Sequence, residues 1–217
     1  MATVIEQYIH YVGEQLAFMG PQKTAAFAAC CAERLLPLYL KYSSDCGWDT
    51  HSYLDDALDT VYDVLLQQVS TDFLIPILPD VTELIPRDNR SESALFTSAR
   101  DCALCIDEAL RQLLTQAERP PASSGYALEA LASLELGCPN GVSGFGTTAA
   151  DELVEKQIIA LPAIQMEIVW QRRDIEALAG ASDAAEVIDT LRITACKNAV
   201  TFVGSQLRFG SRFASGW

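Results

Sequence analysis

The stretch THSYLDDALDTVYDVLLQQ, residues 50–68, places acidic and apolar side chains at helical spacing. With about 100° per residue and Asp55 set at 0°, Asp59, Asp63 and Asp56 fall at about 40°, 80° and 100°. The opposite arc carries the apolar side chains of Tyr53, Ala57, Leu58, Val61, Val64 and Leu65. The stretch therefore predicts an amphipathic helix with one carboxylate face and one core face.

Similar spacing recurs along the chain, and strict alternation of apolar and polar residues is hard to find. Apolar residues three and four apart predict further helices over about 4–18, 24–42, 92–116, 126–136, 148–179 and 183–206. Three prolines between residues 70 and 90 leave room there for short helical turns only. The sequence thus predicts an all-α, single-domain bundle of about seven helices over residues 1–207. The tail 208–217 either is disordered or docks onto the acidic body.

Two prolines fall inside predicted helices. Pro37 lies within 24–42, where it removes a backbone donor and clashes with the preceding turn. We therefore expect a kink or a break near Leu36. Pro162 is expected to bend the long helix predicted over 148–179.

Negative charge dominates the chain, with 29 acidic against 15 basic residues and a net charge of −14. Residues 43–90 hold ten carboxylates against two arginines, which leaves −8 in this block alone. Such a concentration costs stability through self-repulsion and attracts a positively charged partner. Nucleic acid and acidic membrane surfaces are disfavoured as partners, because binding to phosphates needs clustered Lys and Arg.

Several features predict a cytoplasmic protein that neither crosses nor binds a membrane. No apolar run approaches the roughly 18 residues of a membrane span. The start MATVIEQYIH lacks a basic segment and carries Glu6, unlike a signal peptide. The seven cysteines are an odd number for a disulfide framework.

The spacing Asp55-Asp56-x-x-Asp59 is the one that all-α prenyl-diphosphate enzymes use to hold Mg²⁺ against a diphosphate. Such a site also needs a second acidic cluster and basic residues for the phosphates, and neither is evident in the sequence. An acidic face turned to solvent or to a partner is the favoured interpretation. No metal, cofactor or catalytic residue is predicted.

A second candidate site is Cys102-x-x-Cys105, which has the spacing of a redox pair or of half a zinc site. Both cysteines share a helical stripe with Ile106, Ala109 and Leu113, as core residues do. Zinc would need two more ligands, and the two histidines of the chain are isolated in sequence. Core packing is therefore predicted for this pair.

Two segments resemble a bacterial family of unknown function, the YjaG-like helical proteins. The first is FAACCAERLLPLYLKY, residues 27–42, and the second is QMEIVWQRRDIEALAG, residues 165–180. The residues that carry the likeness are Glu33, Arg34, Pro37 and Tyr39 in the first segment, and Arg173, Asp174, Ile175 and Glu176 in the second. The resemblance spans about residues 5–180.

This resemblance implies an all-α single domain and brings no catalytic residues. Proteins similar to this family also occur beside secreted bacterial toxins, which associates them with immunity proteins. Independently of the resemblance, a buried arginine in a helical bundle needs a carboxylate partner. Asp174 or Glu176 is expected to form an interhelix clamp with Arg34.

The function predicted from these features is binding of a basic protein, most concretely neutralisation of a bacterial toxin by an immunity protein. Two alternatives stay open: a metal-dependent enzyme acting on a diphosphate through the Asp55 cluster, and a helical scaffold without catalysis. A homo-oligomer is compatible with each of them. The predicted contact residues for the basic partner are Asp45, Trp48, Asp49, Asp55, Asp56, Asp59 and Asp63.

Overall fold

α-Helices form the regular structure in the described part of the chain, which confirms the all-α prediction. The structure is a computed structural model that describes residues 3–48, 51–87, 93, 95–115, 122–138, 141–142, 145 and 152–213. Side chains are described for these residues except 51, 152, 153 and 202–213. Within these ranges, no helix has a stretch long and apolar enough to cross a membrane.

Nine α-helices and two short 3-10 helices follow one another in the described ranges. They are α1 (Val4–Ala17), α2 (Pro21–Asp45), α3 (His51–Leu65), η1 (Thr71–Leu74), α4 (Ile77–Leu84), α5 (Phe96–Thr115), α6 (Ser123–Leu136), α7 (Glu152–Ile159), α8 (Pro162–Gly180), η2 (Ala184–Glu186) and α9 (Ile188–Phe213).

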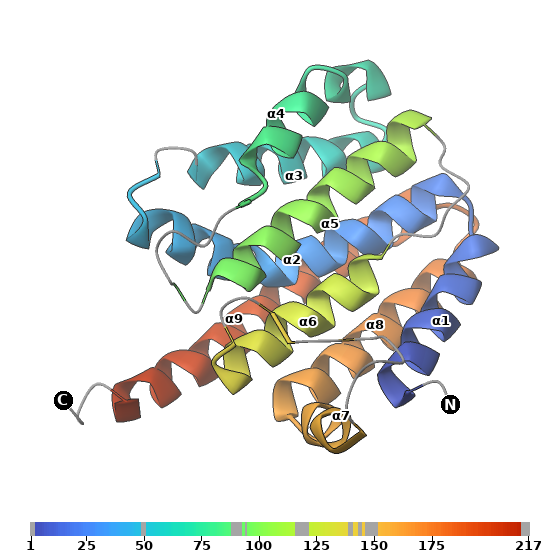
Figure 1. The fold of residues 1–217 in the computed structure, drawn as a ribbon. Helices are drawn as coiled ribbons and strands as arrows, with labels where there is room; N and C mark the ends of the chain where they lie inside the picture. The colour runs from blue at the N-terminus through green and yellow to red at the C-terminus, as the bar shows by residue number, and fades with distance from the viewer. Residues whose placement is uncertain are drawn as a thin grey trace.

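The helix α2 runs through the middle of the molecule, and the other helices pack around it (Figure 1). It contacts α3, α5, α6, α8 and α9. Every residue from 24 to 36 is buried, so this helix has no solvent face along that length. Its small side chains, such as Ala25, Ala28 and Ala32, allow neighbouring helices to approach from several sides.

Pro37 lies inside a continuous helix, whereas Pro162 begins a new one. The helix α2 continues through Pro37 to Asp45, so the expected break is absent, because packing on all sides holds the helix together. Pro162 does more than bend a helix. It is the first residue of α8 and separates this helix from α7, a position where its missing N–H costs nothing.

The helix count and the last helix also differ from the prediction. The separation at Pro162 and the short helix α4 raise the number above the expected seven. The predicted segment 183–206 begins as the 3-10 helix η2, and α9 then continues to Phe213. The backbone of residues 208–213, predicted as part of a tail, is therefore helical; residues 214–217 lie outside the described ranges.

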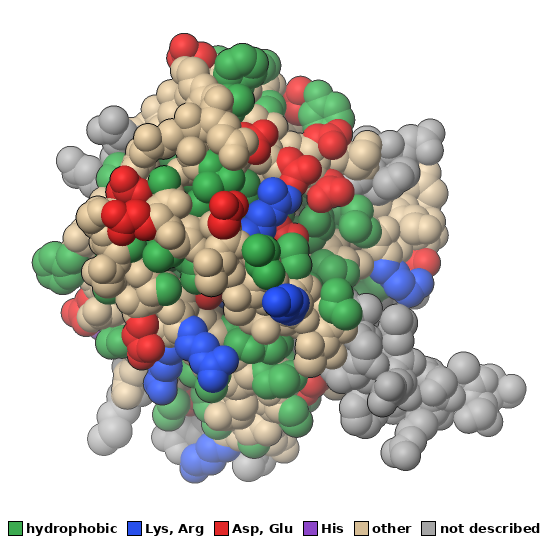
Figure 2. All heavy atoms as spheres, turned by 180° about the vertical axis from the view of Figure 1, so that it is seen from behind, with side chains coloured by type: hydrophobic (Ala, Val, Ile, Leu, Met, Phe, Trp, Pro, Cys, Tyr) green, Lys and Arg blue, Asp and Glu red, His purple; other side chains and the backbone are tan. Residues whose placement is uncertain are grey.

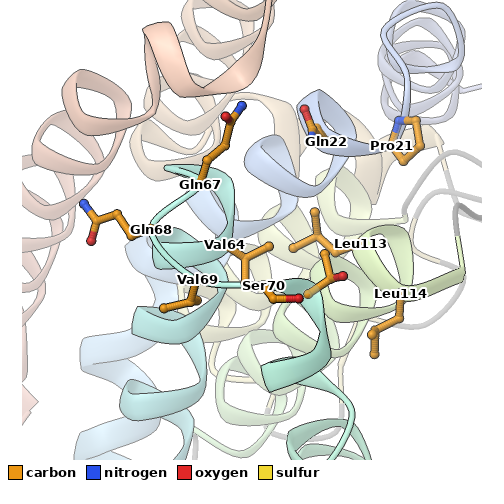
Figure 3. A pocket seen from close by; sticks show the side chains of 10 residues that line it. Pro21, Gln22, Val64, Gln67, Gln68, Val69, Ser70, Leu113 and Leu114 are labelled. Carbon is orange, nitrogen blue, oxygen red and sulfur yellow. The ribbon is translucent and has the colours of Figure 1, made fainter.

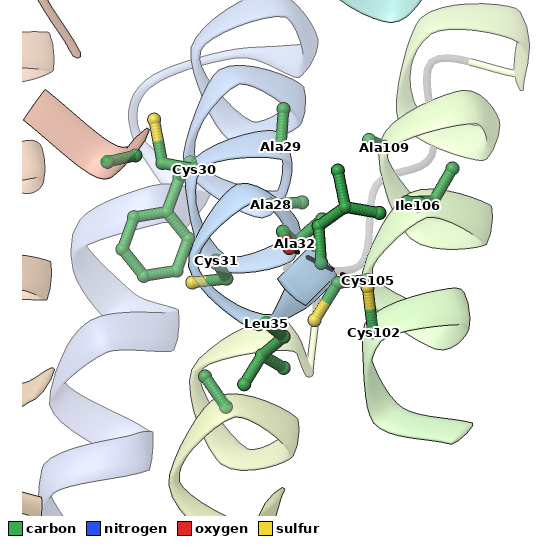
Figure 4. Packing of buried hydrophobic residues seen from close by; sticks show 14 of the residues in the cluster. Ala28, Ala29, Cys30, Cys31, Ala32, Leu35, Cys102, Cys105, Ile106 and Ala109 are labelled. Atoms are coloured by element: carbon green, nitrogen blue, oxygen red, sulfur yellow. Dashed lines mark hydrogen bonds between the residues drawn. The ribbon is translucent and has the colours of Figure 1, made fainter. Parts of the chain in front are cut away.

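The cysteines of the predicted Cys102-x-x-Cys105 pair are core residues, as expected. Both are fully buried where α5 packs on Ala28, Ala32 and Leu35 of α2 (Figure 4). The Cys102 thiol donates to the carbonyl oxygen of Ala32 at 3.6 Å. Burial raises the pKa of both thiols, so neither is a thiolate at neutral pH.

Candidate functional site

The predicted acidic face is present on α3. Leu54, Ala57, Leu58, Val61 and Leu65 are buried and anchor the helix to the core. On the opposite side, Asp55, Asp56 and Asp59 are exposed and Asp63 is half-buried. In Figure 2, acidic side chains gather in the upper half of the face seen from behind. The helical periodicity of the sequence therefore placed these carboxylates on the correct side.

Helix α4 adds one more carboxylate to this surface. Tyr53 was predicted in the core, but it lies at the edge of the apolar arc and is 47% exposed. Its hydroxyl donates to the Asp80 carboxylate at 3.0 Å and so links α3 to α4. We refer to Asp55, Asp56, Asp59, Asp63 and Asp80 together as the acidic surface.

The ionised form of Asp55 is disfavoured by its surroundings in the acidic surface. Partial burial raises the pKa of Asp55, and the neighbouring Asp59 and Asp56 raise it further. Arg192 opposes this shift to a smaller extent. A free-energy cost is therefore present in the isolated chain, and an added positive charge relieves it.

Arg192 of α9 is a counter-charge that the sequence analysis missed. Its guanidinium pairs with Asp59 and lies 4.4 Å from the centre of the Tyr62 ring. Its Nε atom is 3.7 Å from Oε2 of Glu33. The acidic surface thus already binds one guanidinium, contributed by the chain itself, through a carboxylate and an aromatic face.

Glu33 lies beneath this contact and is 8% exposed. Its Oε1 atom accepts a hydrogen bond from the Cys196 thiol at 3.0 Å, whereas its buried Oε2 atom has no hydrogen-bond donor among the described residues. Burial raises the pKa of Glu33, and the pKa of Cys196 rises to about 11 because of its own burial and this hydrogen bond. At neutral pH, Cys196 is therefore a thiol donor rather than a nucleophile.

The other predicted contact residues are Asp45, Trp48 and Asp49. Asp45 ends α2 and pairs with Lys41 at 2.9 Å. Trp48 is half-buried, with its ring edge-on to Tyr42 at 5.5 Å. Asp49 lies outside the described residues. Tyr62 of α3 is fully buried, so its ring is not available to anchor a partner.

The diphosphate alternative gains no support from this geometry. Among the described residues, no three His, Cys, Asp or Glu side chains come together as ligands for a metal ion. Asp59, the third carboxylate of the proposed motif, contacts Arg192 instead.

A second polar cluster lies inside the bundle, around Arg34 of α2. The Arg34 guanidinium donates to both carboxylate oxygens of Glu167, at 2.8 and 2.9 Å, and to Oδ2 of Asp174 at 2.7 Å. All three side chains are almost completely buried. The predicted clamp with Asp174 is confirmed, whereas Glu176 is exposed and Glu167 takes the second position.

Neutral side chains complete the hydrogen bonds of this buried cluster. The Gln171 amide donates to Glu167 at 3.0 Å and accepts from the hydroxyls of Ser124 and Tyr8, at 2.7 and 3.1 Å. The cluster therefore joins α1, α2, α6 and α8. Glu167, Gln171 and Asp174 are four and three residues apart on α8, and this polar stripe was the signal that the sequence analysis overlooked.

Asp101 on α5 is a further buried carboxylate. It is fully buried and pairs through Oδ1 with Arg100 at 2.8 Å, while no donor in the described part of the chain reaches its buried Oδ2 atom. Burial raises the pKa of Asp101 to about 8, although Arg100 opposes the shift. This carboxyl is consequently protonated in much of the folded protein at neutral pH.

Comparison with known proteins gives a family and a fold. A family model described as "Protein of unknown function (DUF416)" matches residues 12–206. The crystal structure of a DUF416 family protein from Shewanella baltica OS155 is similar, with a TM-score of 0.67 and 18% sequence identity. The match covers 85% of this chain and 92% of the Shewanella chain. No curated protein matches the sequence. These findings support the predicted membership in a helical family of unknown function, and the finer likeness to YjaG-like and immunity proteins stays a prediction.

Proposed function

Because this chain belongs to the DUF416 family, whose function is unknown, we propose its function from its own surfaces: it binds a basic protein through the acidic surface. The observation that supports this proposal is the grouping of exposed Asp55, Asp56 and Asp59 on a helix whose other face is fixed in the core. A rigid array of one charge raises the association rate with an oppositely charged partner.

The contact between Arg192 and the acidic surface supports a partner that presents arginine or lysine. A guanidinium there gains a carboxylate, Asp59, and the face of the Tyr62 ring. Asp55 and Asp56 are exposed on the same helix, and the raised pKa of Asp55 means that another cation nearby is favourable. A basic side chain from a partner would therefore meet exposed carboxylates next to the guanidinium that α9 already contributes.

In its finer form, the proposal is that the chain is a cytoplasmic immunity protein that covers a basic surface or cleft of a bacterial toxin. The free, largely buried cysteines suit a reducing compartment. Catalysis is not part of the proposal, since covering a basic cleft requires binding alone.

Capture of a partner followed by charge neutralisation tests the proposal. The tagged chain is expected to recover a basic protein from the source organism, and the triple variant Asp55→Asn, Asp56→Asn, Asp59→Asn to bind this protein more weakly and with a shallower salt dependence. The matched control is Glu14→Gln, Glu176→Gln, Asp189→Asn, which removes the same charge from exposed positions on other helices. Equal affinities and equal salt dependence for the two triple variants would show that the acidic surface is not the binding site.

A further inference from the structure

A groove lies where the start of α2 faces the ends of α3 and α5 (Figure 3). Its volume is about 580 Å³, within the range of roughly 300–1,000 Å³ that ligand pockets occupy. Gln22 contributes from α2, Val64 and the turn residues Gln67 and Gln68 from the end of α3, and Leu113 from α5. Three segments that are far apart in the sequence thus form its walls.

Among the residues that the structure describes, those lining the groove carry neither charged nor aromatic side chains. Gln22, Gln67 and Gln68 carry carboxamides, each of which both donates and accepts hydrogen bonds, and the remaining lining is mainly aliphatic. In addition, the backbone N–H of Gln22 lies in the first turn of α2, where no acceptor exists within the helix, and Gly20 provides no side-chain cap. A charged ligand would lose its hydration without meeting a counter-charge from these described lining residues, which suit a neutral ligand.

Gln67 adopts a backbone conformation that favours glycine. Its φ is 60°, and its N–H donates to the carbonyl of Val64 at 3.0 Å. The N–H of Gln68 donates to the carbonyl of Asp63 at 2.9 Å, which completes the turn that ends α3. Any side chain at position 67 costs stability relative to glycine. Here that side chain contributes a carboxamide to the groove wall.

We propose that this groove binds an extended, uncharged peptide segment with an aliphatic side chain. The peptide amide is matched by the carboxamides of Gln22 and Gln67, which come from different walls. The aliphatic side chain is matched by Val64, Leu113 and Leu114. A backbone amide needs one hydrogen-bond donor and one acceptor, and it carries no net charge. The carboxamides of the described lining residues offer both and are uncharged as well.

The segment is assigned to the basic partner because the groove continues from the acidic surface. Asp63, the last carboxylate of α3, is followed in the same helix by Val64, which lines the groove. A partner seated on α3 therefore reaches the groove with the adjoining part of its chain. This assignment of the source rests on the proposed function, whereas the chemistry of the groove does not.

Binding of N-acetyl-leucine N-methylamide, followed by NMR, tests the groove without a partner. We expect chemical shift changes at Gln22, Gln67, Gln68 and Leu113, and about fivefold weaker binding in Gln67→Gly, which corresponds to one lost hydrogen bond. Glycine suits a φ of 60°, so this variant is expected to unfold at a higher temperature, and weaker binding cannot come from misfolding. Gln157→Ala, at an exposed position of α7, is the control. Equal binding of N-acetyl-leucine carboxylate, or no shift changes in the groove, would overturn the proposal.

The captured partner separates this proposal from the proposed function. Gln67→Gly is expected to weaken partner binding without changing its salt dependence, because no charge is removed, while the aspartate triple variant keeps its binding to the leucine amide. Unchanged partner affinity in Gln67→Gly would overturn the assignment of the segment to that partner. Leucine-amide binding in a chain that captures no basic protein would support the groove and contradict the proposed function.

Discussion

Two neighbouring residues of α2, Glu33 and Arg34, take part in opposite kinds of charge cluster. Arg34 faces Glu167 and Asp174 inside the bundle, where all three side chains are almost completely buried. Glu33 faces Arg192, whose guanidinium is one-third exposed and also pairs with the half-exposed Asp59. Each cluster thus brings one arginine to two carboxylates, and they differ chiefly in exposure to water.

Exposure decides what each cluster can do. When one member of a buried cluster is removed, the remaining charges are neither paired nor hydrated, which costs free energy. The members of a buried cluster therefore cannot leave one another to bind a partner protein. Charges in contact with water keep most of their hydration when a partner leaves, so they can exchange one partner for another. Because its members are buried, the Arg34 cluster has a structural role. The acidic surface is exposed to water and is therefore available for binding.

The largest effect is expected for Arg34→Met. This change leaves the buried carboxylates of Glu167 and Asp174 without a counter-charge, and we expect the free energy of unfolding to fall by about 3–5 kcal/mol. Urea denaturation measures this loss. Arg173→Met, at an exposed position of α8, is the control. A loss no larger than that of the control would contradict the structural role of the Arg34 cluster.

The next effect concerns Asp101, which is buried but has a single, partly exposed arginine partner. Its pKa is about 8 in the folded chain, compared with about 3.9 in an unfolded one. Between these values the folded chain holds a proton that the unfolded chain lacks. The stability contributed by this group is therefore complete below about pH 4 and falls as the pH rises to about 8.

Asp101→Asn removes this pH dependence. We expect the difference in unfolding free energy between wild type and variant to change by on the order of 1 kcal/mol per pH unit between pH 5 and pH 7, with the variant favoured at the higher pH. Denaturation of both proteins across this range measures it. Stability curves that run parallel would mean that Asp101 is ionised in the folded chain.

A smaller effect is expected for Arg192→Ala. The partly exposed contacts with Asp59 and Tyr62 contribute about 1 kcal/mol to stability, which thermal unfolding measures. The variant also leaves the acidic surface with one cation fewer, so the affinity for a captured basic partner should rise. Weaker partner binding, or a destabilisation as large as that of Arg34→Met, would contradict the conclusion that the Arg34 cluster is structural while the contacts of Arg192 can be exchanged.

The smallest effect is expected for Lys41→Ala. Lys41 pairs with Asp45 one turn away on α2, and their side chains are 53% and 48% exposed. Such a pair contributes less than about 0.5 kcal/mol, so the denaturation midpoint should stay close to that of the wild type. If the free energy of unfolding fell by more than about 1 kcal/mol, exposed ion pairs would not contribute less to stability than buried ones in this protein.

The sequence predicted those parts of the structure that depend on one helix at a time. Periodicity placed Asp55 and Asp59 opposite Leu58 and Val61, because both faces belong to one helix. Burial of the Cys102 pair followed from the same reasoning. Tyr53 was misplaced because it lies at the boundary between the two faces, where burial depends on the neighbouring helix α4.

Contacts between distant helices were harder to predict. Asp174 was chosen correctly for Arg34, but Glu167 was missed, although its spacing from Asp174 puts both on one stripe of α8. Arg192 was missed altogether, since nothing in residues 50–68 indicates that α9 lies beside α3. The helix α2 continues through Pro37 because its neighbours enclose it, and a single helical pattern contains no such information.

If a basic partner brings positive charge to the acidic surface, its binding changes the carboxyl pKa of Asp55. Carbon-13 NMR of the Asp55 carboxyl group, followed through a pH titration, gives this value in the free chain and in the complex with the captured protein. We expect the pKa of Asp55 to be raised above its ordinary value in the free chain and to be lower in the complex, because a nearby cation favours the ionised form. The same pKa in both states would contradict it.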